Sequence, residues 1–125
     1  RKKWIHCFDD VTAVIFVAAL SEYNETLFED ETANRMIEAI ELFDQIANSR
    51  YFANSAMLLF LNKRDLFEEK IQRVAINSVS EFSDSGVALG DYEGGVQYFL
   101  QKFLEVNRSG NEVYHHVTCA TDTGN

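Results

Sequence analysis

Proline is absent from the 125-residue sequence, and cysteine occurs only twice. Cys7 and Cys119 are far apart and form no CxxC pair, so the sequence indicates neither a disulfide framework nor a zinc site. We expect both to be reduced thiols, as in proteins of the cytoplasm. The sequence also lacks repeats, low-complexity segments and an internal linker, and its length is typical of one domain with its own core.

Positive charge is scarce as well. Lys and Arg total 11 residues against 20 Asp and Glu, which leaves a net charge of −9. This balance argues against a nucleic-acid partner, because such a partner requires a basic face. The longest apolar run, residues 11–20, is far too short to span a bilayer. The acidic run at residues 22–31 is typical of a solvated surface. Because the chain begins with Arg1 rather than Met, we expect it to be a piece of a longer protein.

Two continuous apolar runs, at residues 13–20 and 56–61, predict β-strands. Neither run alternates polar with apolar residues, which is typical of parallel strands that are buried on both faces. A third run at residues 113–118 is more polar, and it predicts a strand nearer the edge of the sheet.

Between these strands, apolar residues recur at helical spacing. One helix is predicted around residues 36–47, and another from the N-cap residue Asp91 to about residue 107. A shorter helix is expected around residues 67–73. Strands that alternate with helices predict an α/β fold with a doubly wound sheet.

The most informative segment follows the second strand and reads Asn62-Lys63-Arg64-Asp65. In open α/β sheets, ligands bind where the strands reach their carboxyl ends. One carboxylate, that of Asp65, can accept from both N1–H and the 2-amino group of guanine, whereas adenine lacks that amino group. The stem of Lys63 can cover the base, and the amide of Asn62 can tie the loop to neighbouring backbone. A solvated turn is the alternative interpretation of this motif alone.

A second polar segment, residues 118–122, follows the third strand and reads Thr-Cys-Ala-Thr-Asp. The small Ala120 allows close approach of the backbone to a ligand, and its N–H can donate to guanine O6. By itself the segment also fits a plain turn after an edge strand. The order of the two motifs, each at the end of a successive strand, favours the guanine interpretation.

These two motifs resemble the guanine-recognition motifs of the GTPase superfamily. Residues 1–8, 34–44 and 60–71 narrow the resemblance to the α subunits of heterotrimeric G proteins. It covers nearly the whole chain and is weakest from residue 74 to residue 95. The resemblance implies that residues 1–125 form the C-terminal portion of a single Ras-like GTPase domain, from the end of its second switch to its second guanine-recognition loop. The implied fold is a partial P-loop GTPase-like sheet with flanking helices, without the N-terminal strands.

The resemblance also implies two sets of functional residues. The guanine-binding set comprises Asn62, Lys63, Asp65, Cys119, Ala120 and Thr121. The set that contacts partner proteins comprises Lys3, Trp4, Cys7, Arg35, Tyr51 and Phe52. For the aromatic members of the second set, packing within the domain is the competing interpretation.

Neither a GxxxxGK[ST] phosphate loop nor a DxxGGQ motif occurs in the sequence. No catalytic residue is therefore assigned, and we expect the chain alone to hydrolyse no GTP, since hydrolysis depends on placing phosphates, magnesium and water. For the intact protein, the resemblance implies binding of GDP and GTP, and GTP hydrolysis with Mg²⁺ held by residues outside this chain.

The resemblance places the intact protein at the cytoplasmic face of the plasma membrane. There it would relay a receptor signal to an effector, with a βγ dimer as a further partner. The alternative is a non-catalytic interaction module that keeps the partner surfaces and binds no nucleotide. A phospho-acceptor signalling domain is a more distant possibility, because the strand at residues 13–20 ends in Ser21-Glu22 rather than in an acidic cluster. We also expect the free edge of this first strand to promote self-association.

Overall fold

The computed structural model describes residues 13–119, which form three strands, three α-helices and four short 3₁₀ turns. The strands are β1 (Ala13–Ala19), β2 (Ala56–Asn62) and β3 (Val113–Val117). The helices are α2 (Arg35–Ala47), α3 (Arg64–Lys70) and α4 (Tyr92–Glu105). The 3₁₀ turns are η2 (Leu20–Glu22), η3 (Arg50–Phe52), η4 (Ile76–Ser78) and η5 (Ser80–Phe82).

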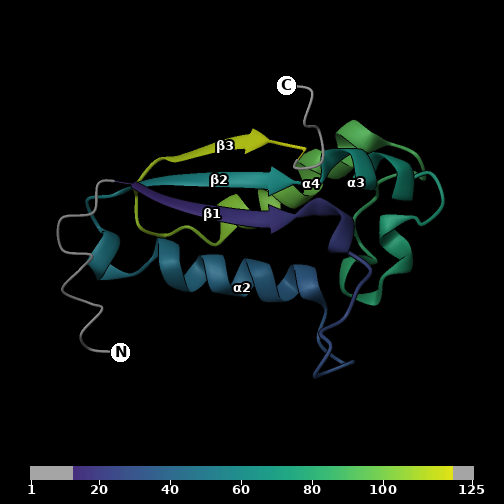
Figure 1. Cartoon of the computed structure of the whole chain (residues 1–125), viewed down its shortest axis with the longest axis horizontal. Coiled ribbons are helices and arrows are strands. Elements are labelled where there is room, and N and C mark those ends of the chain that lie inside the picture. The colour runs from purple at the N-terminus through teal and green to yellow at the C-terminus, as the bar shows by residue number, and fades with distance from the viewer. Residues whose placement is uncertain (1–12, 120–125) are drawn as a thin grey trace.

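The three strands form one parallel sheet in the order β1-β2-β3. Phe16 pairs with Leu59 between β1 and β2, and Leu61 pairs with Val117 between β2 and β3. Figure 1 shows the strands side by side, with their carboxyl ends pointing toward α3. The parallel sheet with helical crossovers confirms the predicted α/β fold. Within residues 13–119, β3 lies at one edge, as its polar sequence predicts.

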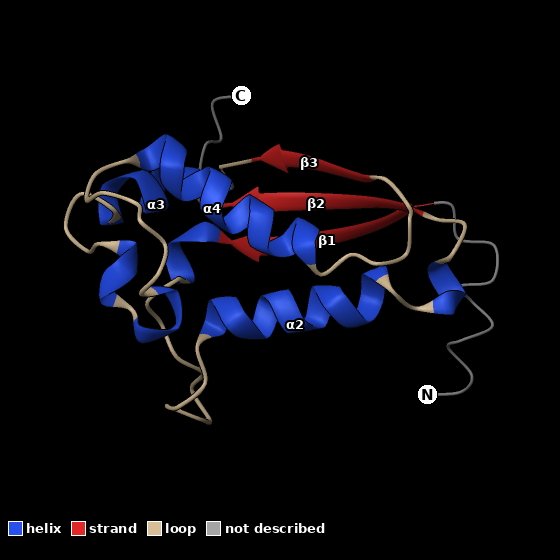
Figure 2. Ribbon diagram, turned by 180° about the vertical axis from the view of Figure 1, so that it is seen from behind, coloured by secondary structure: helices blue, strands red, loops and turns tan. Residues whose placement is uncertain are grey.

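Both crossovers place their helices on one face of the sheet. Viewed from behind, α4 lies in front of the strands and α2 runs below β1 (Figure 2), and Phe43 of α2 packs on Phe16 of β1 and Phe103 of α4. On this inner face the rings of Phe16, Phe43 and Phe103 pack with centroids 5.3 to 6.3 Å apart. Leu59 and Leu61 are fully buried beside them. A right-handed crossover carries its helix to the same face each time the chain steps in the same direction across a sheet.

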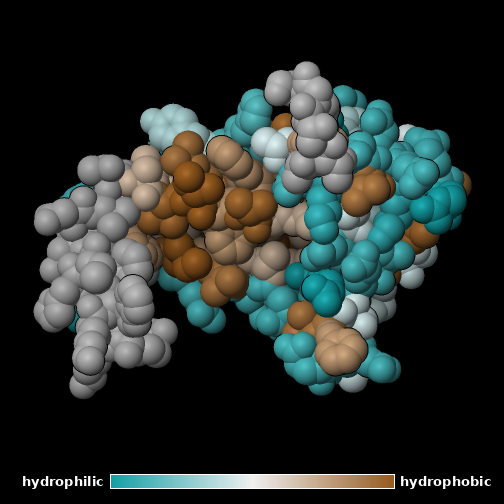
Figure 3. Space-filling view, viewed as in Figure 1, coloured by the Kyte–Doolittle hydropathy of each residue, from teal (hydrophilic) through white to brown (hydrophobic). Residues whose placement is uncertain are grey.

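The opposite, outer face of the sheet is apolar and largely exposed. Ile15 is 62% exposed, Val17 55% and Tyr114 50%, while Leu58 and Phe60 between them are half-buried. Figure 3 shows these strands as a brown hydrophobic surface. The prediction that both faces of the strands are buried is therefore wrong for β1. Both of its helical neighbours lie on the inner face, so residues 13–119 supply no helix for the outer one.

Capping side chains explain two of the helix starts. Asn34 accepts a hydrogen bond from the Ile37 N–H ahead of α2, and Asp91 accepts from the Gly94 N–H ahead of α4, as the sequence predicts. Helix α3 begins earlier than the predicted residue 67, because it starts directly after the end of β2. No helix among residues 13–119 is long and apolar enough to cross a membrane.

Candidate guanine-recognition site

The carboxyl ends of β2 and β3 bring the two predicted guanine motifs together. β2 ends at Asn62, β3 ends at Val117, and Leu61 pairs with Val117 in the parallel register. Residues 62–65 and 118–119 therefore begin at the same edge of the sheet, the one formed by the carboxyl ends of the strands, where α3 also lies (Figure 1). This edge is where parallel α/β sheets hold their ligands.

Thr118 joins the two motifs through three hydrogen bonds. Its hydroxyl donates to Asn62 Oδ1 at 3.0 Å, and its N–H donates to the Leu61 carbonyl at 2.8 Å. Its carbonyl accepts from the Arg64 N–H at 3.0 Å. The amide of Asn62 thus reaches a side chain on the neighbouring strand end, whereas the sequence suggested neighbouring backbone. Thr118 was not among the predicted site residues, because its role depends on the register of β2 with β3.

Lys63 has an unusual backbone conformation. Its φ of 61° and ψ of 44° lie in the left-handed region, and it is the only non-glycine residue with positive φ among those the structure describes. A lysine in this region is disfavoured, and such strain concentrates at functional sites. The conformation turns the chain sharply from β2 into α3, so Asp65 falls in the first turn of the helix at the sheet edge.

The other members of the guanine set are only partly described. Asp65 is exposed, and Cys119 is half-buried next to Thr118. Ala120 and Thr121 lie outside the described residues, so the predicted contact with guanine O6 stays a prediction. The structure thus brings Asn62, Lys63 and Asp65 together with the start of the second motif.

Lys70, at the far end of α3, makes several polar contacts with the segment that follows β1. Lys70 Nζ donates to the Ser21 carbonyl at 2.6 Å, to Asn24 Oδ1 at 2.8 Å and to Glu25 Oε2 at 3.0 Å. It also lies 5.8 Å from the ring centroid of Tyr23. These residues follow β1, so the cluster ties α3 to the end of the first strand. Sequence spacing gave no signal for it.

Tyr23 anchors the same segment inside the core. It is fully buried, and its hydroxyl donates to the Val74 carbonyl at 2.6 Å. Burial raises the pKa of this phenol to about 12. Its ring packs edge-on against Phe67 of α3, with centroids 5.5 Å apart, so the segment after β1 and α3 share one core.

The predicted partner residues fall into separate places. Arg35, the first residue of α2, donates from Nε to the Thr26 carbonyl, whereas Tyr51 and Phe52 lie in η3 beyond the other end of that helix. Tyr51 is 42% exposed and Phe52 packs against the core. Thirteen helical residues separate the two places by about 20 Å. Lys3, Trp4 and Cys7 lie outside the described residues.

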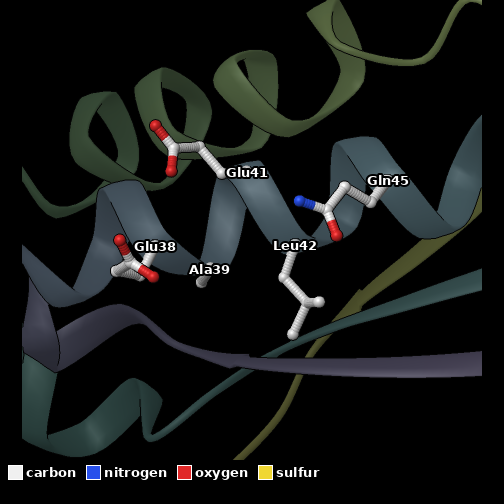
Figure 4. A pocket seen from close by; sticks show the side chains of 5 residues that line it. All are labelled: Glu38, Ala39, Glu41, Leu42 and Gln45. Atoms are coloured by element: carbon white, nitrogen blue, oxygen red, sulfur yellow. The ribbon is translucent and has the colours of Figure 1, made fainter.

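Two surface hollows lie away from the guanine motifs. The first, about 260 Å³, is lined only by α2 side chains, which Figure 4 shows projecting from the helix. They are Glu38, Ala39, Glu41, Leu42 and Gln45. The second, about 510 Å³, is formed by the loop before α2 and includes Arg35 and the 94%-exposed Phe28. Neither offers the base-recognising groups found at the sheet edge.

Metal binding has no candidate in this part of the chain. Among residues 13–119, no three His, Cys, Asp or Glu side chains gather closely enough to hold an ion. The described residues therefore do not fit a magnesium site, and no chemical step is assigned to one here.

Comparisons with known proteins show to which family the chain belongs. The family model described as "G-protein alpha subunit" matches residues 1–125. The alpha-3 subunit of Caenorhabditis elegans is 55% identical over 124 residues, covering 98% of this chain and 34% of that protein. The alpha-1 subunit of Kluyveromyces lactis is 54% identical over 123 residues, covering 98% of this chain and 27% of that protein. The chain thus spans about a third or less of the length of these guanine nucleotide-binding proteins. It belongs to the G-protein alpha subunit family.

Proposed function

We propose that this chain supplies the guanine-recognition part of a nucleotide-binding signalling switch. The observation that carries the proposal is the joining of Asn62 to Thr118 at the sheet edge, with Lys63 and Asp65 beside them. This bond joins residues 56 positions apart in the chain, which supports one shared surface for the two motifs. The family membership of the chain supports the same assignment.

Base selectivity follows from the chemistry of the proposed set. The Asp65 carboxylate accepts from N1–H and the 2-amino group of guanine in a charge-assisted, bidentate pair. The stem of Lys63 covers the base, and Asn62 holds the loop against Thr118. The proposal assigns the other side of the base to Cys119, Ala120 and Thr121, with the Ala120 N–H as the donor to O6. Adenine presents the opposite donor and acceptor pattern at both places, so it is rejected.

In the intact protein, this site belongs to a GTPase that alternates between GDP-bound and GTP-bound states. It relays signals from a membrane receptor to an effector at the cytoplasmic face of the plasma membrane. Mg²⁺ and the phosphates are held by residues outside this chain, which we expect to bind nucleotide weakly and to hydrolyse none. A base pocket without phosphate contacts corresponds to dissociation constants in the millimolar range, roughly −4 kcal/mol.

The competing proposal is an interaction module that binds partners and no nucleotide. Exposed Tyr51, with the Arg50 guanidinium 5.6 Å from its ring centroid, offers an aromatic contact for an effector. Arg35 and Phe52, with Lys3, Trp4 and Cys7, complete the proposed surfaces for an effector and a βγ dimer. Binding of βγ by a chain that shows no guanine preference would favour this alternative.

The deciding experiment is a titration of the 125-residue chain and its Asp65→Asn variant with GDP and with XDP, followed by NMR. Xanthine carries a carbonyl where guanine has its amino group. The variant, which gains an amide donor, should therefore bind GDP about tenfold more weakly and prefer XDP. Asp84→Asn, an exposed acid outside the site, serves as the control. If GDP preference survived in Asp65→Asn, Asp65 would not contact the base.

A further inference from the structure

Helix α3, which carries Asp65, needs restraints from outside itself. It is only seven residues long, and helices this short are unstable in isolation. Phe67 is its one buried residue, packed against Tyr23, Tyr92 and Phe99. Apolar contacts of this kind are non-directional. A single buried ring within the helix therefore needs further contacts to set the tilt of the helix. Some of them come from the Arg64 N–H, which donates to the Thr118 carbonyl at 3.0 Å, and from the fully buried Ile71 just after the helix.

Lysine side chains on either side of Phe67 make further contacts that restrain the helix. Lys63, just before the helix, has its Nζ 3.9 Å from Glu22 Oε2. Lys70, the last helical residue, has three acceptors within 3.0 Å, which match the three N–H donors of an ammonium group. The three acceptors of Lys70 and the ion-pair partner of Lys63 all belong to residues 21–25, the segment that follows β1.

We propose that residues 21–25 are a positioning element of the guanine site, which acts through Lys70. This inference rests on the proposed role of Asp65 in base recognition. The segment holds the end of α3 and so contributes to the tilt of the helix about Phe67. Because Asp65 lies two residues before Phe67 and Lys70 three residues after it, a movement at Lys70 moves Asp65 in the opposite direction. Neither Lys70 nor its partners contact the base.

The two lysines do not contribute equally. The side chain of Lys70 is 18% exposed and donates three hydrogen bonds of 2.6 to 3.0 Å, so its contacts are less screened than that of Lys63. The Lys63 side chain is 41% exposed and reaches Glu22 only at 3.9 Å, and such surface pairs contribute little. Lys70 is therefore the positioning residue to test.

The test uses the ratio of two affinities. GMP and IMP differ only in the 2-amino group, so the ratio of their dissociation constants reports the contact with the Asp65 carboxylate. For the 125-residue chain we expect GMP to bind about tenfold more tightly than IMP in NMR titrations. In Lys70→Gln the ratio should fall below about threefold, because a shift of about 1 Å weakens a directional contact. A merely structural loss would weaken GMP and IMP equally and leave the ratio unchanged.

A second variant changes the side chains of residues 21–25 that accept hydrogen bonds from Lys70. Asn24→Ala combined with Glu25→Ala removes two acceptors at exposed positions, so the fold is expected to persist. It should lower the ratio as Lys70→Gln does, and combining all three changes should lower it no further. Lys102→Gln, on α4 with its Nζ over the Tyr98 ring, is the control and should keep the wild-type ratio.

The outcomes separate this inference from the proposed function. If the unmodified chain failed to prefer GMP over IMP, the guanine site itself would be overturned. A wild-type preference that persisted in both the Lys70→Gln and the segment variants would overturn only the positioning role. Loss of the preference in Lys102→Gln as well would also overturn it, because the effect would then be unspecific.

Discussion

The two faces of the sheet differ more in burial than in the apolar character of their residues. On the inner face, Phe16 and Leu59 pack under α2 and α4 and are buried. On the outer face, Ile15 and Val17 come from the same apolar run of β1, yet both are more than half exposed. Apolar residues therefore alternate along β1 between a packed core and an open surface. Only the inner half of this run stabilises the chain as it stands.

The largest expected effect of a substitution comes from the inner face. Phe43→Ala removes a fully buried ring that packs on Phe16 and Phe103, and such deletions cost about 3–5 kcal/mol of unfolding free energy. Val17→Ala, on the outer face, should cost less than about 1 kcal/mol. Urea unfolding of both variants measures the difference. Equal losses would show that the outer face is packed in solution.

Much of the fold could be predicted from the sequence. Continuous apolar runs predicted β1 and β2 to within two residues, and the N-cap Asp91 marked the start of α4. The exposure of Ile15 and Val17 could not be predicted in this way. Hydrophobic runs report which residues favour burial, whereas the face that helices cover is set by strand order and crossover handedness.

The candidate site likewise has residues that could be predicted from the sequence and contacts that could not. Asn62, Lys63 and Asp65 were recognisable because their order along the chain carries the motif. The hydroxyl contact of Thr118 with Asn62 was not, since it depends on how β2 and β3 pair. The same is true of Lys70, whose acceptors lie 45 to 49 residues earlier in the chain. The left-handed φ of Lys63 could not be predicted from the residues around it, because a lysine side chain disfavours that conformation.

The next effect concerns the helix that covers the inner face. Gly95 in α4 leaves no room for a side chain: an added Cβ would lie 2.8 Å from both Ile71 Cδ1 and Phe67 Cζ. Alanine favours helices by about 1 kcal/mol over glycine, but crowding of a packed core costs about 1–3 kcal/mol. Gly95→Ala should therefore destabilise the chain by about 1–2 kcal/mol in urea unfolding. A stabilised variant would mean that α4 packs more loosely on α3 than described.

A comparable effect is expected for the buried phenol on the helix-covered side. Tyr23→Phe removes the hydroxyl that donates to the Val74 carbonyl at 2.6 Å and should cost about 1–2 kcal/mol. Burial raises the pKa of Tyr23 from 10.0 to about 12. The neutral phenol is thus favoured by the folded state, so its contribution is complete below about pH 10 and is lost as pH rises toward 12. Urea unfolding at pH 8 and pH 11 measures how much unfolding free energy is lost as the pH rises. This loss should be smaller for Tyr23→Phe than for the unmodified chain. Equal losses would contradict the burial of this group.

The smallest effect on stability is expected on the outer face, at Val17. Within residues 13–119, no strand pairs with the second edge of β1, and no charged side chain lies on the three strands. We therefore expect the 14.3 kDa chain to self-associate through this edge and the apolar face beside it.

Val17→Lys should change the free energy of unfolding by less than about 1 kcal/mol, because the side chain is exposed. It should nevertheless lower the weight-average mass in light scattering, since two copies would then bring like charges together. Leu42→Lys, at a 49%-exposed position on α2, is the matched control and should leave that mass unchanged. A monomeric unmodified chain, or equal effects of both lysines, would show that the outer face does not drive association.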